Sequence, residues 1–389
     1  MRLLVVGGGA AGTAAAWVAA RMGVDVHLLH GRAGATEMFS GALDESEARS
    51  GREPAKPSGE VREFLEALGG VWVAREDSRV CTRLGVIRPV GAAQAPLLDL
   101  GRLAGGHVGV AAVPREGWDA ELLAEGFADS DWARRTSTRF SAVSLPLVQH
   151  PSELRISSYD FARKLDSPDR LARLEHALAS TASQFDGWLF GPWLGVETDV
   201  AERLRESLGR PLGETTSPPE GPAGARFAIA RDRLLQRMGV TVHPREARAL
   251  DVRDSGWVVE LGPVSSASAG LGPEQMCFDA VVLAVGGLAS GGIELWHPDP
   301  PQPDVALSVR APVRFAADGV SLDGPSGLFG IDWQRWGAEA LERIGVVTDQ
   351  ASVPEAQALF AAGSLLSDRP RTMLEAIRSG IEAGVRTAG

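Results

Sequence analysis

The chain has 389 residues, of which 44% are hydrophobic and 23% charged, a composition typical of a globular protein with a large core. Its formal net charge of −11 argues against nucleic acid or an anionic membrane as its main partner. Cys81 and Cys277 are its only cysteines, too few for an iron–sulfur cluster, and no His-rich pattern indicates a zinc site. No stretch reaches the roughly 18 apolar residues of a spanning helix. We therefore expect a cytoplasmic chain without a metal site or a membrane span, in which any membrane association would come through a partner.

The chain opens with the pattern of a dinucleotide-binding turn. An apolar strand at Leu3–Val6 leads into Gly-Gly-Gly-Ala-Ala-Gly at residues 7–12, and an Ala-rich helix is predicted over Thr13–Met22. In a G-x-G-x-x-G turn the first glycine permits the sharp turn, the second leaves room for a pyrophosphate, and the third lets the helix pack on the strand. The helix N-terminus adds free N–H groups and the positive end of its dipole. We expect the phosphates to be held by Gly7, Gly9, Ala10, Ala11 and Gly12.

The second predicted strand, Val24–Leu29, ends without the carboxylate that usually binds a nucleotide ribose. His30 and Arg32 stand there instead. Either side chain could contact the ribose or a phosphate, or remain a solvated loop residue. The missing carboxylate weakens an NAD interpretation, although it does not identify another cofactor by itself.

The chain between the second predicted strand and about residue 220 contains two regions with different predicted elements. Up to about residue 100 we expect a polar loop, a helix, a short strand and a hairpin, at 46–59, 61–68, 71–73 and 80–100. The region from about 105 to 220 then mixes one strand, three helices and a further strand with a turn, at 108–113, 119–126, 157–165, 169–180 and 187–193. A proline-rich connector at 217–222 closes it, so this region is predicted to be an inserted domain.

Signals of a nucleotide-binding sheet return after the connector. A helix is expected at Arg226–Met238, with strands at 240–243 and 257–261. Two buried parallel strands then each end in glycine, one running from Asp279 to Gly286-Gly287 and the other from Ala358 to Gly363-Ser364. A last helix is predicted over Met373–Val385.

These elements predict an α/β protein with a Rossmann-like nucleotide-binding domain, a mainly parallel sheet and an inserted α+β cap or substrate domain. The resemblance given below implies that the first domain is an FAD-binding domain. We assign residues 1–105, 221–290 and 336–389 to the discontinuous flavin-binding domain. Residues 106–220 and 291–335 are assigned to the cap domain.

The order and spacing of these glycine motifs resemble flavoproteins of the two-dinucleotide-binding-domain superfamily, in which such strands bracket the nucleotide fold. The segments 39–44, 283–293, 344–349 and 359–364, with Trp333 and Trp336, further resemble the second flavin subunit of the anaerobic glycerol-3-phosphate dehydrogenase. That subunit works beside a catalytic flavin subunit and an iron–sulfur subunit. The resemblance implies flavin contacts at Gly7, Gly9, Gly12, Ser40, Gly41, Gly286, Gly287, Gly363 and Ser364.

One segment departs from this family. The family has a glycine-rich turn before its last helix, whereas residues 366–372 here read Leu-Ser-Asp-Arg-Pro-Arg-Thr. The flavin type, its affinity or the substrate could therefore differ. The family subunit carries FMN, but a pyrophosphate turn suits a cofactor with two phosphates, so we favour FAD and keep FMN as the alternative.

Because a flavin performs the redox chemistry itself, the protein needs groups that bind anions and move protons. Arg83 and Arg88 could bind a phosphate or carboxylate, and His150 and His297 could accept a proton. All four are weak catalytic candidates. The resemblance implies a flavin-dependent oxidoreductase subunit that passes electrons from glycerol 3-phosphate oxidation to a partner or quinone. The alternatives are an independent FAD oxidoreductase of another small molecule and a non-catalytic scaffold subunit.

Overall fold

The computed structural model describes residues 1–43, 56–57, 59–219, 221–253, 256–262, 274–296, 304–316, 342–354 and 356–388. The chain divides into two compact units. Unit 1 comprises Met1–Thr36, Ser58–Ala67 and Arg231–Gly389, and unit 2 comprises Glu37–Pro57 and Leu68–Ala230. The two units are described separately below.

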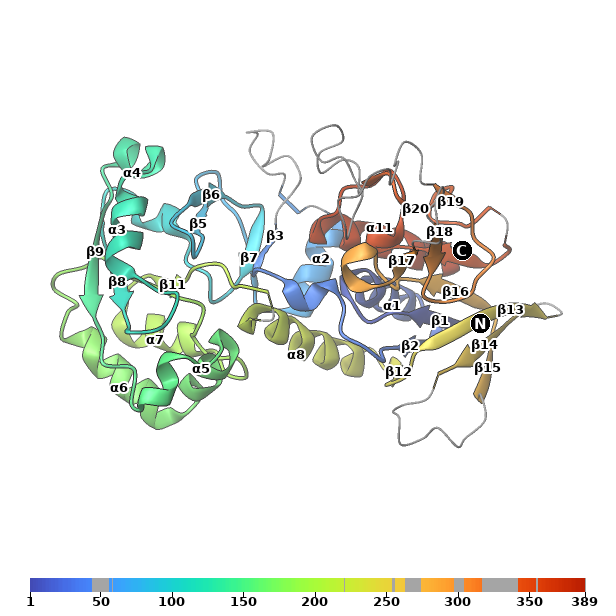
Figure 1. The fold of residues 1–389 in the computed structure, drawn as a ribbon, viewed down its shortest axis with the longest axis horizontal. Helices are drawn as coiled ribbons and strands as arrows, with labels where there is room; N and C mark the ends of the chain where they lie inside the picture. The colour runs from blue at the N-terminus through green and yellow to red at the C-terminus, as the bar shows by residue number, and fades with distance from the viewer. Residues whose placement is uncertain are drawn as a thin grey trace. The chain divides into compact units, whose positions relative to one another are not determined.

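Unit 1 is built on a five-stranded parallel sheet (Figure 1). Its strands lie in the order β12 (Thr241–His243), β2 (Asp25–Leu29), β1 (Arg2–Val6), β16 (Ala280–Leu283) and β21 (Leu359–Ala361). β1 pairs with β2 on one side and with β16 on the other, so the strand order reverses at β1. Ligands of open parallel sheets bind beyond the carboxyl ends of the strands at such a reversal.

Alternate residues of these strands face two different layers. Leu3 and Val5 of β1 pack towards α1 (Ala10–Arg21) and α11 (Met373–Ala388), which lie side by side in Figure 1. Leu4 and Val6 face the opposite layer, a three-stranded antiparallel sheet. Its strands are β13 (Ala247–Arg253), β14 (Gly256–Leu261) and β15 (Glu274–Phe278). Both faces of the parallel sheet are therefore covered by apolar side chains, as strands of continuous Leu and Val require.

Smaller elements complete unit 1. The antiparallel pairs are β17 (Ile293–Trp296) with β18 (Asp304–Leu307), and β19 (Phe315–Ala316) with β20 (Gly345–Val346). Helix α2 (Gly59–Leu68) packs Phe64 edge-on against Trp17 of α1. Helix α8 (Pro222–Arg237) crosses the division between the two units.

Unit 2 contains a second parallel sheet. Its strands lie in the order β11 (Leu212–Glu214), β10 (Gly187–Phe190), β8 (His107–Ala112) and β9 (Arg139–Ser144). Val108 and Val110 of β8 face α3 (Ala120–Ala128) and α4 (Asp131–Thr136). Ala111 faces the other layer, formed by α5 (Ser158–Leu165), α6 (Pro168–Ala179) and α7 (Val200–Leu208). Helices thus cover both faces of this sheet as well.

Two antiparallel groups accompany the second sheet. β3 (Ala42–Leu43), β7 (Ala92–Gln94) and β4 (Val71–Val73) form one sheet, and β5 (Arg79–Cys81) pairs with β6 (Ile87–Pro89). The pairing of β5 with β6 is the hairpin that the sequence predicted between residues 80 and 100.

The structure confirms the α/β class, the Rossmann-like domain and the mainly parallel sheet, and it adds a parallel sheet to the region expected to be α+β. The division of the chain differs from the predicted one. Residues 37–57, 68–105 and 221–230 belong to unit 2, where β4 and β7 pair with β3. Residues 291–316 belong to unit 1, because Ile293 and Val309 pack into its core. The remainder of the predicted cap segment, 317–335, lies outside the described residues.

Candidate functional site

Three glycine segments meet at the carboxyl edge of the unit 1 sheet. Gly7 follows β1, Gly286 follows the neighbouring strand β16, and Gly363 follows β21 beside it. A Cβ atom on Gly7 would lie 2.2 Å from the carbonyl oxygen of Ala284, and one on Gly363 would lie 2.8 Å from Cβ of Ala11. The sequence motifs that pointed to a nucleotide are therefore brought together within one unit.

The turn at residues 7–12, which follows β1, is as tight as its glycines predicted. Gly7 has a φ of +115°, a conformation that side chains disfavour. A Cβ on Gly12 would lie 1.8 Å from the carbonyl oxygen of Gly7, so α1 can begin close to β1 only because residue 12 has no side chain. These two glycines set the path of the chain.

Gly9 is not required by the path of the chain, but it leaves open space beside the turn. Its backbone is extended, with φ −75° and ψ −170°, so a side chain is sterically permitted there. The single atom within 4 Å of a Cβ on Gly9 would be Oγ1 of Thr36, at 3.0 Å. The space beside Gly9 is therefore left open by the described residues.

Backbone N–H groups face the same place. The first amides of a helix lack an intrahelical acceptor, and here the Ala10 amide donates to Thr36 Oγ1 at 3.1 Å. Within the described part of the chain, the amides of Ala11 and Gly12 have no acceptor. A phosphate oxygen could take the position of the Thr36 hydroxyl and accept from these amides, so the turn fits a diphosphate.

Arg231 contacts both the glycine turn, at Gly8, and His30. The Arg231 guanidinium, 7% exposed as a residue, donates to the carbonyl oxygen of Gly8 at 3.1 Å and to Nε2 of His30 at 3.0 Å. Burial, and then the Arg231 charge, lower the pKa of His30. Because an arginine can only donate, Nε2 of His30 accepts, and the neutral ring carries its proton on Nδ1.

Arg32 takes a different role. Its Nη2 donates to the carbonyl oxygen of Gly291 at 2.7 Å, in the loop that follows β16. It therefore joins the loops after β2 and β16. Arg231 and Thr36 were not singled out in the sequence, since nothing local marks an arginine at residue 231 as a neighbour of Gly8.

The second and third glycine segments are joined by a hydrogen bond. The Gly287 amide donates to Ser364 Oγ at 2.9 Å, and a Cβ on Gly287 would lie 2.4 Å from the Ser364 carbonyl oxygen. Arg371, from the segment that departs from the family pattern, donates to the carbonyl oxygens of Ser364 and Ile344. Arg371 thus holds the loop between β21 and α11, where the glycerol-3-phosphate dehydrogenase family has a glycine-rich turn.

Ser40 and Gly41 lie in unit 2. Gly41 accepts a hydrogen bond from the Gln94 amide at 2.8 Å, and Ser40 accepts one from the Ser217 amide at 2.8 Å. The oxygen Oε1 of Gln94 and Oγ of Ser217 are buried and have no hydrogen-bond partner among the described residues. The predicted flavin contact of Ser40 and Gly41 stays a prediction.

Three of the four weak catalytic candidates lie among the described residues. His297 lies outside the described residues. His150 accepts from the Ser152 amide at 3.2 Å through Nδ1 and so caps a short helical turn. Arg88 lies half-buried in β6, whereas Arg83 is exposed at the tip of the β5–β6 hairpin and lines a pocket of unit 2.

The cysteines and acidic side chains add no metal centre to this description. Cys81 is buried and Cys277 is exposed on β15. In the described ranges, no group of three or more His, Cys, Asp or Glu side chains is arranged to hold a metal ion. No helix among the described residues combines the length and hydropathy needed to cross a bilayer.

Comparisons with known proteins give one family match and several structural ones. The profile of the family described as "GIDA: Glucose inhibited division protein A" matches residues 2–80, which include the glycine turn. No curated protein matches the chain.

The chain is similar to solved structures at low identity. CabE, an aromatic hydroxylase from angucycline biosynthesis, is 13% identical with a TM-score of 0.36, over 100% of this chain and 61% of that one. AlpK is 12% identical with a TM-score of 0.35, over 99% of this chain and 60% of that one. T. acidophilum thioredoxin reductase is 13% identical with a TM-score of 0.23, over 99% and 97%. The chain thus spans about three fifths of the length of the first two structures.

Proposed function

We propose that this chain is a flavin-dependent oxidoreductase and that unit 1 binds its cofactor, FAD. The observation that carries the proposal is the convergence of the Gly7–Gly12 turn, Gly287 and Ser364 at the carboxyl edge of β1, β16 and β21. The match of residues 2–80 to the GIDA profile supports the same cofactor. FAD is favoured over FMN because the amides of the turn can hold two phosphates.

The residues of unit 1 would divide the binding between them. The amides of Ala10, Ala11 and Gly12 would hold the diphosphate, and the open space at Gly9 would admit it. Arg231, which is buried and pairs with Asp232, adds a guanidinium next to the turn. When bound, the flavin supplies the ability to accept a hydride or single electrons.

The finer proposal concerns the substrate and the electron path. The segments 39–44, 283–293 and 359–364 resemble the second flavin subunit of anaerobic glycerol-3-phosphate dehydrogenase, which makes glycerol 3-phosphate the first donor to test. In this proposal the chain passes electrons onward and works with a catalytic flavin subunit and an iron–sulfur subunit.

The segment around Arg371 favours a second candidate, an FAD oxidoreductase that acts alone on another small molecule. Arg371 belongs to the segment 366–372, where the glycerol-3-phosphate dehydrogenase family has a glycine-rich turn, and it donates to the carbonyl oxygens of Ser364 and Ile344. A charged side chain beside the last glycine segment would change the surroundings of a flavin and of its substrate.

The cofactor and the donor can be tested on the purified full chain. We expect yellow protein that releases FAD on heating, identified by its mass. A folded, colourless chain that takes up no flavin would contradict the proposal. With glycerol 3-phosphate and a dye acceptor, the relay role predicts slow turnover by the chain alone and faster turnover with its partner subunits. Rapid turnover of another donor by the lone chain would support the second candidate.

A further inference from the structure

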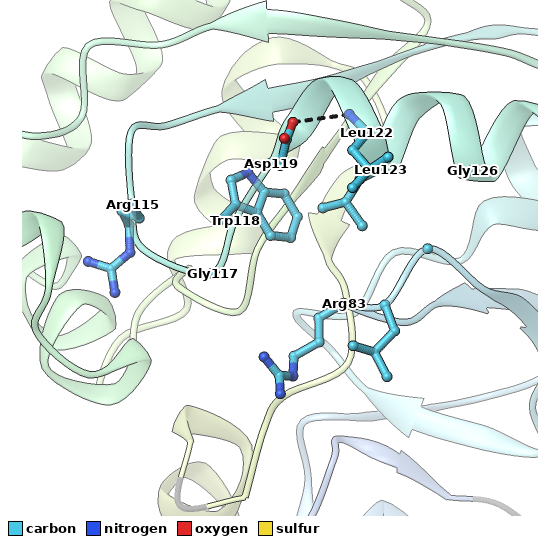
Figure 2. A pocket seen from close by; sticks show the side chains of 10 residues that line it. Arg83, Arg115, Gly117, Trp118, Asp119, Leu122, Leu123 and Gly126 are labelled. Carbon is cyan, nitrogen blue, oxygen red and sulfur yellow. Dashed lines mark hydrogen bonds between the residues drawn. The ribbon is translucent and has the colours of Figure 1, made fainter.

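A pocket of about 600 Å³ lies in unit 2, between the tip of the β5–β6 hairpin and the start of α3. This volume is within the range of small-molecule sites. Figure 2 shows Arg83 on one side of the pocket and Trp118, Leu122 and Leu123 on the other. All of the lining residues belong to unit 2, so the pocket does not depend on the cofactor region of unit 1.

The walls of this pocket expose apolar side chains to solvent. Leu84 is 76% exposed and Leu122 is 65% exposed, and both line it. The indole Nε1 of Trp118 already donates to the carbonyl oxygen of Ala111 at 2.7 Å, so a ligand would meet only the apolar part of the ring. A ligand with an apolar body would remove this surface from water, which is favourable in proportion to the area buried.

Two of the three charged groups in the lining are already committed. The Arg115 guanidinium donates to the carbonyl oxygens of Glu153 and Ile156, at 2.6 and 2.7 Å, and lies over the ring of Phe161. The Asp119 carboxylate accepts from the amides of Glu121 and Leu122 and caps α3. Neither group has to change partners for a ligand to bind.

Arg83 is the remaining charge. It forms no hydrogen bond or ion pair with any residue that the structure describes, and it is exposed. The backbone of the turn that carries it is held by Thr82 Oγ1, which accepts from the amides of Leu84 and Val86. A guanidinium in the lining of a pocket with apolar walls is suited to a carboxylate, sulfonate or phosphate group by paired hydrogen bonds.

We propose that this pocket binds a small organic anion with an aromatic or aliphatic body. The body contacts Trp118, Leu122 and Leu84, and the anionic group pairs with Arg83. The pocket has the volume of a small-molecule site, and Arg83 is the one cation among its described lining residues that has no hydrogen-bond partner. Both features favour a small molecule over a protein surface as the ligand. The proposal goes beyond the flavin chemistry and does not depend on it.

Two probes of similar shape test the charge requirement. Anilinonaphthalene sulfonate is an aromatic anion, and N-phenylnaphthylamine is nearly the same body without the charge. By calorimetry on the purified full chain, we expect the sulfonate to bind at this site at least about tenfold more tightly than the neutral probe. In Arg83→Gln the sulfonate should lose about tenfold in affinity, while the affinity for the neutral probe stays unchanged.

Further variants separate this site from unspecific adsorption. Leu122→Ser changes an exposed side chain and should weaken both probes without loss of fold. Arg134→Gln, a control on α4 whose arginine pairs with Asp131, should change neither. Equal sulfonate affinity in wild type and Arg83→Gln, or equal affinity of the two probes for the wild type, would overturn the proposal. The FAD content should be the same in all variants, so failure here leaves the cofactor proposal standing.

Discussion

At the scale of single residues, Arg231 is the least expected contributor to the candidate cofactor site. It lies 223 positions from Gly8 in the chain, yet its guanidinium donates to the Gly8 carbonyl oxygen and to His30. A buried arginine is costly unless its donors are satisfied and its charge is paired. Here Nε and Nη2 pair with Oδ1 of Asp232 at 2.8 Å, and Nη1 contacts Gly8 and His30. A diphosphate bound at the adjacent turn would be a second anion near this guanidinium.

Replacing Arg231 by Met tests this role. The Gly8 carbonyl oxygen loses its donor, and the turn loses its neighbouring positive charge. We expect the dissociation constant of FAD to rise at least about tenfold, and the free energy of unfolding to fall by about 1–3 kcal/mol. The matched control is Arg233→Met, since Arg233 is exposed on the same helix. Equal FAD affinities in the two variants would show that Arg231 does not assist binding.

At the scale of elements, α1 and α11 pack with almost no side chain between them. A Cβ on Gly380 would lie 2.2 Å from the carbonyl oxygen of Ala11, and a Cβ on Gly384 would lie 2.3 Å from Cγ1 of Val18 and 2.6 Å from the Ala15 carbonyl oxygen. Alanine would normally stabilise a helix relative to glycine. At these positions the close contact of the two helices reverses that preference.

The prediction is that Gly384→Ala destabilises the protein. Overpacking against α1 costs about 1–3 kcal/mol, which exceeds the gain in helix propensity of about 1 kcal/mol. Gly126→Ala in α3 is the comparison, because its Cβ would meet the Gly85 carbonyl oxygen at an ordinary 3.6 Å. It should raise the free energy of unfolding by about 0.5–1 kcal/mol. Urea denaturation of both variants decides this, and a stabilising Gly384→Ala would show that the helices are not in such close contact.

At the scale of the whole molecule, the parts that depend on local pattern were predictable. The apolar run before Gly7 and the Ala-rich run after it identify β1 and α1, and the runs ending at Gly286 and Gly363 identify β16 and β21. The glycine segments after β1, β16 and β21 are expected at one edge of the sheet, since the carboxyl ends of parallel strands lie together. This is why the glycine part of the candidate site could be placed from the sequence.

The division into units could not be predicted in the same way. It depends on which short strands pair, and β3, β4 and β7 have only two or three residues each. Strands of this length carry too little alternation to indicate a partner. The contacts of Arg231 and Thr36 with the glycine turn also depend on the folded chain. Their sequence neighbourhoods carry no sign of them.

The central claim is that the turn after β1 binds the diphosphate of FAD, and the most direct measurement is FAD affinity in Gly9→Val. The extended backbone at Gly9 accepts a side chain, but valine would fill the space that the phosphates need. Gly34→Val is the control, with no atom within 4 Å of its Cβ position. By fluorescence titration of the cofactor-free chain, Gly9→Val should lose FAD binding, and wild type and Gly34→Val should bind it equally, with all three folded. Normal FAD binding by a folded Gly9→Val would contradict the account.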